Sequence, residues 1–559
     1  MDRRTLLAGG ASALVPRLLR GQRAKAARPN VLLLFTDEQR HDTLGVGGSR
    51  AARTPNLDKL AASGVRFTDA CTPSPICIAA RMSLISGHRS RHTRFAGNGA
   101  LPGPPSRFPT MMDALLEAGY RTHAIGKMHF SGRHYGLIEH ETMEETVPYR
   151  DADDYLLYLK SHGVRKRYPQ GLRDLLYLQP QTCDIPKEHA QSTWIADRAA
   201  AFLRGHQLHR GDQPFFLWAS WIAPHPPFAP CEPYASMFRA EDMPLPIYRD
   251  RPLASLPSPA WKERARFDGA QHDPDRLRRI KALYHAQIAH IDEGIGRVMA
   301  ELDRLGMAEN TVVLFASDHG EMLGDHGLAH KSVPYEASAR IPMSMRWPGR
   351  TEAGRVRHDP VGLDDIFPTV LDGLGLRYPS NFAPPTGKSL LSRPGGGVDR
   401  DAYVTEFGSG ASRWISLRSR ERKYVLWAAG GREEEYDLAA DPEERVNLAG
   451  RGSRYRERVL EWERTHGLPE SFEGGRFRTF DEPPVPKEDP RAVHINDAKW
   501  PERLPPGERG SVESYAEAFT SAIRHEPSLA PGKLSVADYK KKGGHSLVGT
   551  SWEEAWRRA

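Results

Sequence analysis

Four short, uninterrupted apolar segments, each followed by polar side chains, form the clearest pattern along the 559-residue chain. They cover residues 31–35, 120–125, 215–222 and 311–316. Continuous apolar runs of this length are typical of strands that are buried on both faces. We therefore predict four strands of one sheet, each with chemistry-bearing side chains near its carboxyl end.

Helical signals lie between these strands. Thr54 and Pro55 provide an N-cap and a first-turn proline for one helix. Three further helices are predicted over residues 111–118, 189–203 and 275–305. Strands that alternate with helices predict an α/β fold with a large mixed, mostly parallel sheet sandwiched by helices, whose ligands gather at the carboxyl ends of the strands.

The pattern changes after residue 398. Short alternating segments predict a small antiparallel sheet, on which a helix over 455–465 should pack. The predicted strands cover residues 402–406, 414–417, 424–427 and 435–438. We therefore expect an α/β domain over 27–398, a C-terminal α+β subdomain over 399–470 and a Pro-rich extension over 471–559.

Residues 1–26 have the features of an export signal: paired Arg3 and Arg4, an apolar run over 6–15 and the sequence Ala24-Lys25-Ala26. Twin arginines before an apolar run are typical of the twin-arginine pathway. We therefore expect the twin-arginine translocase as a partner and a periplasmic or secreted mature protein. No later window approaches the roughly 20 apolar residues of a membrane span.

The formal net charge of +7 at first suggests a polyanionic partner. Residues 1–26, however, hold six basic side chains against one acidic side chain. The rest of the chain is close to neutral, so we expect no nucleic-acid partner.

The cysteines are too few for a disulfide scaffold, and they lack the C-x-x-C spacing of zinc and redox sites. They are Cys71, Cys77, Cys183 and Cys231. Cys77 precedes an apolar helical run, so its thiol would face the positive end of the helix dipole, with Arg81 one turn further along. Cys77 is therefore either a reactive thiol or a small buried hydrophobic residue.

The polar residues near the strand ends are of two chemical kinds. Asp37, Asp318 and His319 are oxygen and imidazole donors of the type that binds a divalent cation, and Glu38 would add a fourth donor. The second kind comprises cations and proton carriers, namely Arg81, Lys127, His129, His225 and Lys331. Together they suit an anionic tetrahedral group such as a sulfate or phosphate ester.

These residues lie in motifs that resemble those of the sulfatases of the alkaline phosphatase superfamily. The resemblance extends over residues 28–449. It begins with the strand that ends at Asp37 and with Cys77 followed by Arg81. The other motifs are Thr54-Pro55-Asn56-Leu57-Asp58, Gly126-Lys127-Met128-His129, Pro224-His225-Pro226-Pro227, Ser317-Asp318-His319-Gly320-Glu321 and Glu435-Tyr436-Asp437-Leu438. It implies an alkaline phosphatase-like fold and the hydrolysis of a sulfate monoester.

The resemblance also implies site roles. Cys77 would be oxidised to formylglycine, whose hydrated form attacks sulfur, and Arg81 would orient it. One divalent cation would bind this group. Its implied ligands are Asp37, Glu38, Asp318 and His319, and hard oxygen donors favour Ca²⁺ over Mn²⁺ or Mg²⁺.

The remaining implied roles concern sulfate and protons. Lys127 and Lys331 would neutralise the sulfate oxygens. His225, together with Lys331, would protonate the departing oxygen as a general acid. His129 would then take a proton and regenerate the aldehyde.

Three residues depart from the usual family pattern: Ala79 stands where proline is common, Glu38 where Asp or Gln is common, and His319 where many calcium sulfatases have Asn. Ala79 leaves open whether a formylglycine-generating enzyme or an anaerobic sulfatase-maturating enzyme is the maturation partner.

Histidine at the position of His319 also occurs in related hydrolases, so a phosphonate monoester or phosphodiester hydrolase is the alternative enzyme. A non-catalytic binder of sulfated glycans is the alternative outside the enzymes. The expected substrate is a sulfated small molecule or glycan.

Overall fold

The computed structural model describes residues 28–103, 108–130, 133–145, 153–164, 178, 180–265, 273–391, 398–450 and 453–487. The predicted export signal over 1–26 and most of the predicted extension over 471–559 lie outside these residues. Within the described part of the chain, no helix is both long and apolar enough to cross a membrane.

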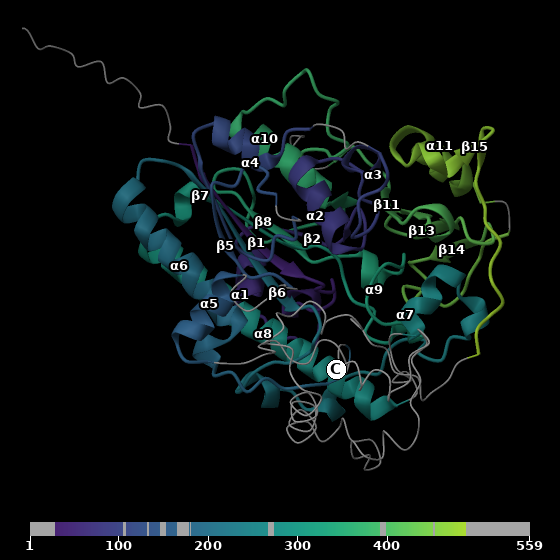
Figure 1. Ribbon diagram of the computed structural model, residues 1–559, viewed down its shortest axis with the longest axis horizontal. Coiled ribbons are helices and arrows are strands. Elements are labelled where there is room, and N and C mark those ends of the chain that lie inside the picture. The colour runs from purple at the N-terminus through teal and green to yellow at the C-terminus, as the bar shows by residue number, and fades with distance from the viewer. Residues whose placement is uncertain are drawn as a thin grey trace, which may run out of the picture.

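An eight-stranded mixed sheet lies at the centre of the molecule (Figure 1). In spatial order its strands are β5 (Glu139–Thr142), β4 (Arg121–Gly126), β6 (Phe215–Pro224), β1 (Asn30–Asp37), β7 (Thr311–Ser317), β8 (Met343–Arg346), β2 (Val65–Phe67) and β9 (Arg355–Arg357). The first five pair in parallel, and antiparallel pairing begins where β8 joins β7 and β2. The four strands expected from the apolar runs are adjacent, which confirms the predicted mostly parallel sheet.

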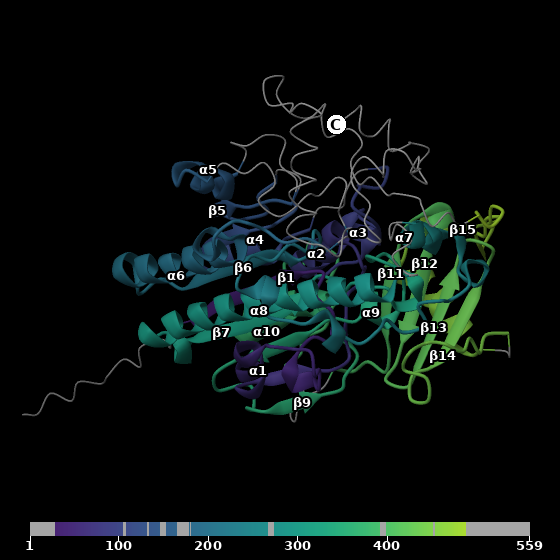
Figure 2. The ribbon, with the colours of Figure 1, turned by 90° about the horizontal axis from the view of Figure 1, so that it is seen from below.

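Helices cover both faces of this sheet (Figures 1 and 2). One face carries α2 (Cys77–Ser86), α4 (Met111–Glu117) and α10 (Ile366–Leu374), and the other carries α1 (Pro55–Ala62), α5 (Asp154–Ser161), α6 (Gln191–Arg210) and α8 (Pro274–Arg304). Along β1, Val31, Leu33 and Phe35 pack on the first face, whereas Leu32 and Leu34 pack on the second. Burial of both faces explains the continuous apolar sequence of this strand.

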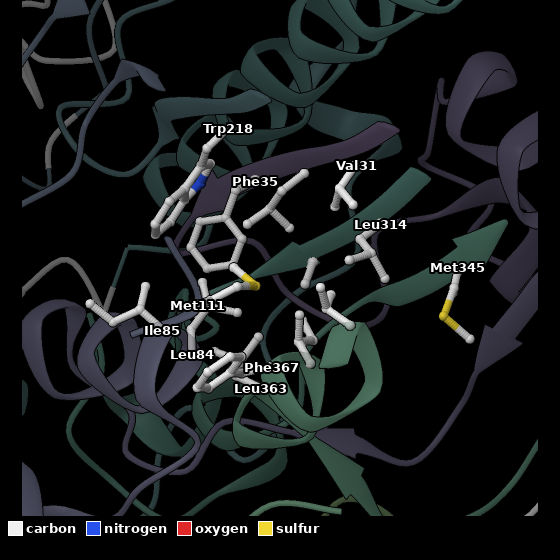
Figure 3. Close-up of a cluster of buried hydrophobic side chains, with 14 of the residues drawn as sticks. Val31, Phe35, Leu84, Ile85, Met111, Trp218, Leu314, Met345, Leu363 and Phe367 are labelled. Carbon is white, nitrogen blue, oxygen red and sulfur yellow. The ribbon is translucent and has the colours of Figure 1, made fainter. Parts of the chain in front are cut away.

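The core beneath α2 is shown in Figure 3. Phe35 of β1 meets Trp218 of β6 edge to face, with the ring centroids 5.6 Å apart, and Leu84 and Ile85 of α2 belong to the same cluster. All ten residues of α2 are buried. Because close packing surrounds this helix, Cys77 in its first turn has a fixed position relative to the sheet.

Helix α6 is longer than the helix predicted over 189–203. It continues to Arg210, although Leu208 in its last turns retains 77% exposure and Gly205 meets no tertiary neighbour. Amphipathic periodicity marks only the turns that pack on the sheet. The turns of α6 after Leu203 bury only the polar residue His206, so they carry no apolar signal, and the predicted boundary was wrong.

The C-terminal subdomain contains an antiparallel sheet of β11 (Tyr403–Phe407), β12 (Trp414–Arg418), β13 (Arg422–Trp427) and β14 (Glu433–Asp437), as the alternating pattern predicts. Helix α11 (Tyr455–His466) packs on one face. The other face presents Phe407, Trp414 and Trp427 to Ile76, the residue before Cys77. The subdomain therefore packs against the segment that positions Cys77.

Shorter elements complete the described fold: β3 (Ala70–Cys71), β10 (Val361–Gly362), α3 (Ser90–Thr93), α7 (Trp261–Ala265), α9 (Glu336–Ala339), β15 (Phe472–Glu473) and β16 (Arg476–Phe477). Cys71, Cys77, Cys183 and Cys231 all lie within the described residues and form no disulfide bond in this structure.

A buried charge network joins the subdomain to the larger sheet. Glu336, at the start of α9, accepts from Arg418 of β12 at 2.9 Å and from Lys423 of β13 at 3.0 Å. Burial alone would raise the pKa of Glu336, but Arg418 and Lys423 hold it well below its ordinary value. Glu336 is therefore ionised and paired in the folded protein.

Replacement of Glu336 by glutamine is expected to lower the free energy of unfolding by about 3 kcal/mol, because Arg418 and Lys423 lose a shared buried counter-charge and keep only Asp69 and Glu444 among the described residues. Urea unfolding would measure this change. As a control, Glu241→Gln removes one partner of the exposed Arg239–Glu241 pair and should leave the unfolding midpoint unchanged. Equal midpoints for Glu336→Gln and the wild type would contradict a stabilising role for the network.

Candidate active site

The carboxyl ends of four adjacent parallel strands bring the predicted site residues together. Asp37 ends β1, Lys127 follows β4, His225 follows β6 and Asp318 follows β7. These residues are far apart in sequence, and the parallel topology places them at one edge of the sheet. The predicted convergence of the strand ends is present in the structure.

Asp37, Cys77, Asp318 and His319 form the first cluster of the site. One donor atom from each residue lies within 4.8 Å of the others, and all four residues are buried. Sγ of Cys77 is 3.3 Å from Nε2 of His319 and 3.7 Å from Oδ1 of Asp37. Nδ1 of His319 donates to the carbonyl oxygen of Gly320 at 3.0 Å, so the lone pair of Nε2 faces the cluster.

The donor chemistry of this cluster fits a divalent cation. Ligand atoms on opposite sides of an ion, at bond lengths of about 2.0–2.5 Å, lie about 4–5 Å apart. The spread of the cluster agrees with that separation. Asp37, Asp318 and His319 would be its protein ligands, since they supply two carboxylates and an oriented imidazole.

Glu38, the fourth expected ligand, lies in a neighbouring group of donor atoms. This carboxylate lies in a second buried group, within 4.8 Å of donor atoms of His225 and His330. It also accepts a hydrogen bond from Nζ of Lys331 at 2.7 Å. Asp37 and Glu38 are consecutive, but their carboxylates belong to different groups.

Arg81 fixes the two carboxylates of the first cluster. Its guanidinium is fully buried, with Nε 3.0 Å from Oδ2 of Asp318 and Nη2 3.4 Å from Oδ2 of Asp37. Nη1 donates to the Lys127 carbonyl oxygen at 2.6 Å and to Oγ of Ser220 at 3.1 Å. Arg81 thus links α2 to the ends of four strands and sets the direction of both carboxylates.

Lys127 is a buried cation beside the first cluster. Its Nζ is 3.7 Å from Sγ of Cys77 and forms ion pairs with Asp37 and Glu145. An ammonium group in this position can bind an oxygen of a tetrahedral anion held next to Cys77.

The surrounding charges make Cys77 unlike an inert buried cysteine. Burial and the Asp37 carboxylate disfavour the thiolate, but nearby cations outweigh them and lower the pKa of Cys77 to about 6. These cations are Lys127, Lys331 and His319. The environment therefore favours the reactive alternative that the sequence left open.

His225 presents one ring nitrogen to the site. Its Nδ1 donates to the carbonyl oxygen of Pro226 at 2.7 Å, which directs Nε2 toward Glu38 at 3.3 Å and Glu145 at 3.4 Å. Burial lowers the pKa of His225 well below its ordinary value, and Glu145 acts in the opposite direction. The orientation suits proton transfer at Nε2.

His129 lies near Cys77 in a third group of donor atoms. A ring nitrogen of His129 is within 4.8 Å of both Sγ of Cys77 and a carboxylate oxygen of Glu145. The residue has a left-handed backbone, with φ of 59°, and its N–H donates to Glu144 at 3.0 Å. Within the described residues Nδ1 has no hydrogen-bond partner, so the imidazole can accept a proton.

Sequence reasoning missed three residues of the site: Glu144, Glu145 and His330. The two glutamates follow β5 in a segment without periodicity, so nothing in the local sequence indicated their position. His330 directly precedes Lys331, and this adjacency was the one signal that could have found it. The structure places all ten predicted site residues in or beside the two clusters.

Comparisons with known proteins agree with the fold and the site. The family model described as "Sulfatase" matches residues 29–376, and the model described as "N-sulphoglucosamine sulphohydrolase, C-terminal" matches residues 324–461. An arylsulfatase of Clostridium perfringens is 31% identical over 454 residues, covering 77% of this chain and 92% of that protein. The multifunctional alkaline phosphatase superfamily protein PehA of Trinickia caryophylli is 29% identical over 517 residues, covering 78% and 96%.

Among solved structures, the phosphonate monoester hydrolase of Agrobacterium radiobacter matches with a TM-score of 0.68 and 28% identity, covering 78% of this chain and 94% of that chain. Fold, site and relatives together define a sulfuric ester hydrolase with an alkaline phosphatase-like fold. The chain belongs to the sulfatase family, whose model matches more than half of its length. This result favours the predicted enzyme over the non-catalytic alternative.

Proposed function

We propose that this protein is an exported sulfatase that hydrolyses a sulfate monoester of a carbohydrate. The proposal extends to a formylglycine made from Cys77 and to one divalent cation held by Asp37, Asp318 and His319. The observation that carries it is the position of the Cys77 sulfur, within 4.8 Å of donor atoms of all three proposed ligands. The match of residues 324–461 to the family model described as "N-sulphoglucosamine sulphohydrolase, C-terminal" supports a sugar substrate.

A bound divalent cation, with Ca²⁺ as our first choice, would supply positive charge to the sulfate oxygens and to an oxygen nucleophile at position 77. The hydrated aldehyde would supply that nucleophile. Arg81 fixes the directions of Asp37 and Asp318 before substrate binds. This preorganisation avoids the cost of reorienting the two carboxylates during the reaction.

The chain's own cations and imidazoles would handle sulfate and protons. Lys127 and Lys331 bind sulfate oxygens, and His225 acts with Lys331 to protonate the departing alcohol oxygen. His129, whose ring nitrogen lies within 4.8 Å of the Cys77 sulfur, accepts the proton that is released when the aldehyde is restored. An unmodified thiol at position 77 has no second hydroxyl and so lacks this last step.

Mass spectrometry of the tryptic peptide 67–81, from protein matured in its own host, tests the modification directly. The peptide contains Cys71 and Cys77, so fragmentation is needed to place the change. An aldehyde located at Cys77 is the expected result and would also show that Ala79 permits maturation. An intact thiol in active protein would contradict the formylglycine proposal.

A second candidate reaction is hydrolysis of a phosphonate monoester or phosphodiester. It is favoured by the similarity to the phosphonate monoester hydrolase structure and by His319 in the first cluster. The two reactions share the same nucleophile and differ mainly in the charge of the tetrahedral group.

Parallel assays with an aryl sulfate and an aryl phenylphosphonate of the same leaving group separate the two reactions. We expect kcat/KM to be at least about tenfold higher for the sulfate, which corresponds to about 1.4 kcal/mol of transition-state preference. A higher kcat/KM for the phosphonate would replace the first proposal by the second.

A further inference from the structure

Cys183 and Cys231 lie opposite each other on two segments that run side by side, and they belong to none of the donor groups of the active site. They are the paired residues of a parallel β-bridge. The N–H of Cys183 donates to the carbonyl oxygen of Pro230 at 3.0 Å, and the N–H of Gln181 donates to that of Phe228 at 3.3 Å. The two cysteines are about 50 positions apart in sequence, yet backbone hydrogen bonds hold them in register.

This arrangement has the backbone spacing that a disulfide bond needs. Adjacent strands lie about 4.8 Å apart, and the Cα atoms of a disulfide are usually about 4.4–6.8 Å apart. Paired residues of a bridge also direct their side chains to the same face. The apolar contacts agree, because Cys231 belongs to a buried cluster with Ala190 and Tyr234, and Cys183 packs against that same cluster.

The two thiols differ in their access to solvent. Cys231 is 3% exposed, and burial raises its pKa to about 11, whereas Cys183 is half-buried. The thiolate is the form that attacks a disulfide, and it must be able to reach its target. Cys183 is therefore the thiol that an external oxidant reaches first, and Cys231 is placed to complete the bond.

The other two cysteines face different neighbours. Cys71 is paired with Gly362 of β10 and forms a bridge with Arg340, and Cys77 lies in the first cluster of the active site. Cys183 and Cys231 are therefore the pair that the fold aligns for a cross-link.

We propose that Cys183 and Cys231 form a disulfide bond in the exported protein, and that this bond fastens the loop after β6 to the segment before α6. The inference rests on the proposed function for export, because structural disulfides persist in oxidising compartments outside the cytoplasm. The loop after β6 begins at His225 and contains Cys231. The cross-link therefore restrains the loop that carries the proposed general acid.

The bond forms by thiol–disulfide exchange. The Cys183 thiolate attacks an external disulfide, such as oxidised glutathione or the disulfide of an exported oxidoreductase, and one thiol of the oxidant leaves. The Cys231 thiolate then attacks Sγ of Cys183, and the second thiol of the oxidant leaves. Two cysteine thiols are thus oxidised to one disulfide, the external disulfide is reduced to two thiols, and the two cysteine protons pass to these thiols through water.

Peptide mapping without reduction tests the bond directly, on protein exported by its own host and alkylated under denaturing conditions before digestion. Trypsin releases Cys183 in residues 174–187 and Cys231 in residues 211–239. We expect these two peptides as one cross-linked species that a reductant separates, whereas Cys71 should be recovered alkylated. Recovery of both peptides separately, each alkylated at its cysteine, would overturn the inference.

Thermal unfolding with and without a reductant is the second measurement. The cross-link closes a segment that contains α6 and β6, which restricts the unfolded chain. Reduction of the wild type should therefore lower Tm by at least about 3 °C. In Cys183→Ala, which removes a half-buried sulfur, Tm should not depend on the reductant, and Cys71→Ala is the control that should keep the wild-type response. Equal responses of the wild type and Cys183→Ala would contradict the cross-link.

Failure of the cross-link and failure of the proposed export are distinguishable. Cell fractionation and N-terminal sequencing report export, and treatment of the purified, reduced protein with oxidised glutathione reports the pairing by itself. An exported protein in which this treatment yields no cross-linked peptide would overturn the inference. A cytoplasmic protein that forms the bond under the same treatment would contradict export and support the pairing.

Discussion

Replacement of Cys77 by alanine is expected to lower kcat with an aryl sulfate by at least about 10⁴-fold, because alanine cannot be converted to the proposed aldehyde whose hydrate carries the nucleophilic oxygen. Lys127, Arg81 and the carboxylates would remain in place, since α2 is held by packing along its whole length. Substrate binding should therefore persist while turnover is lost. Steady-state kinetics and direct binding of a sulfated ligand measure the two quantities separately.

Cys71 offers a matched control in the same tryptic peptide. It is buried in the short strand β3, where burial raises its pKa to about 11, in contrast to about 6 for Cys77. Cys71→Ala should retain kcat within about threefold, because the residue has no place in the site. Turnover in Cys77→Ala close to that of Cys71→Ala would contradict the assigned nucleophile.

Removal of the cation is expected to have the second large effect. Treatment with a chelator should lower kcat by at least about 10³-fold, since the charge that stabilises the transition state would be lost. Added Ca²⁺ should restore activity, and substitution by Mn²⁺ or Mg²⁺ would compare the alternatives. Activity that survives complete removal of divalent ions would contradict the proposed centre.

Asp318→Asn tests the same centre from the protein side. The carboxylate of Asp318 faces His319 in the cluster and accepts from Nε of Arg81 at 3.0 Å. We expect the variant to lose cation affinity by at least about 100-fold. Asp292→Asn is the control. Asp292 is also buried, and its carboxylate accepts hydrogen bonds from the backbone N–H groups of Asn56 and Leu57. It belongs to helix α8 and not to either cluster of the site. Its cation affinity should be unchanged.

The sequence determined much of the architecture and most of the site. Continuous apolar runs identified β1, β4, β6 and β7, because strands covered on both faces have no polar alternation. A parallel order of these strands predicts that Asp37, Lys127, His225 and Asp318 lie at one edge, and the observed sheet has that order. The motifs around these residues also indicated the family, which the comparisons confirm.

Other features could not be predicted from local sequence. The last turns of α6 bury only the polar residue His206, so they have no hydrophobic periodicity that could mark the end of the helix. Glu145 lies beside Lys127 and His225 because β5 pairs in parallel with β4 and so ends at the same edge of the sheet. The buried pairing of Glu336 with β12 and β13 joins residues about 80 positions apart.

Glu38 illustrates this division most clearly. The sequence determined that a second carboxylate follows Asp37 at the end of β1, and the family pattern suggested that both bind one cation. The direction of the Glu38 side chain depends on its left-handed backbone, which Asp318 and Tyr284 fix from distant parts of the chain. Residue order thus decides which groups reach the edge of the sheet, because strand topology follows from the apolar pattern. Only the tertiary structure decides which group each carboxylate faces, because long-range hydrogen bonds set the backbone angles at that edge.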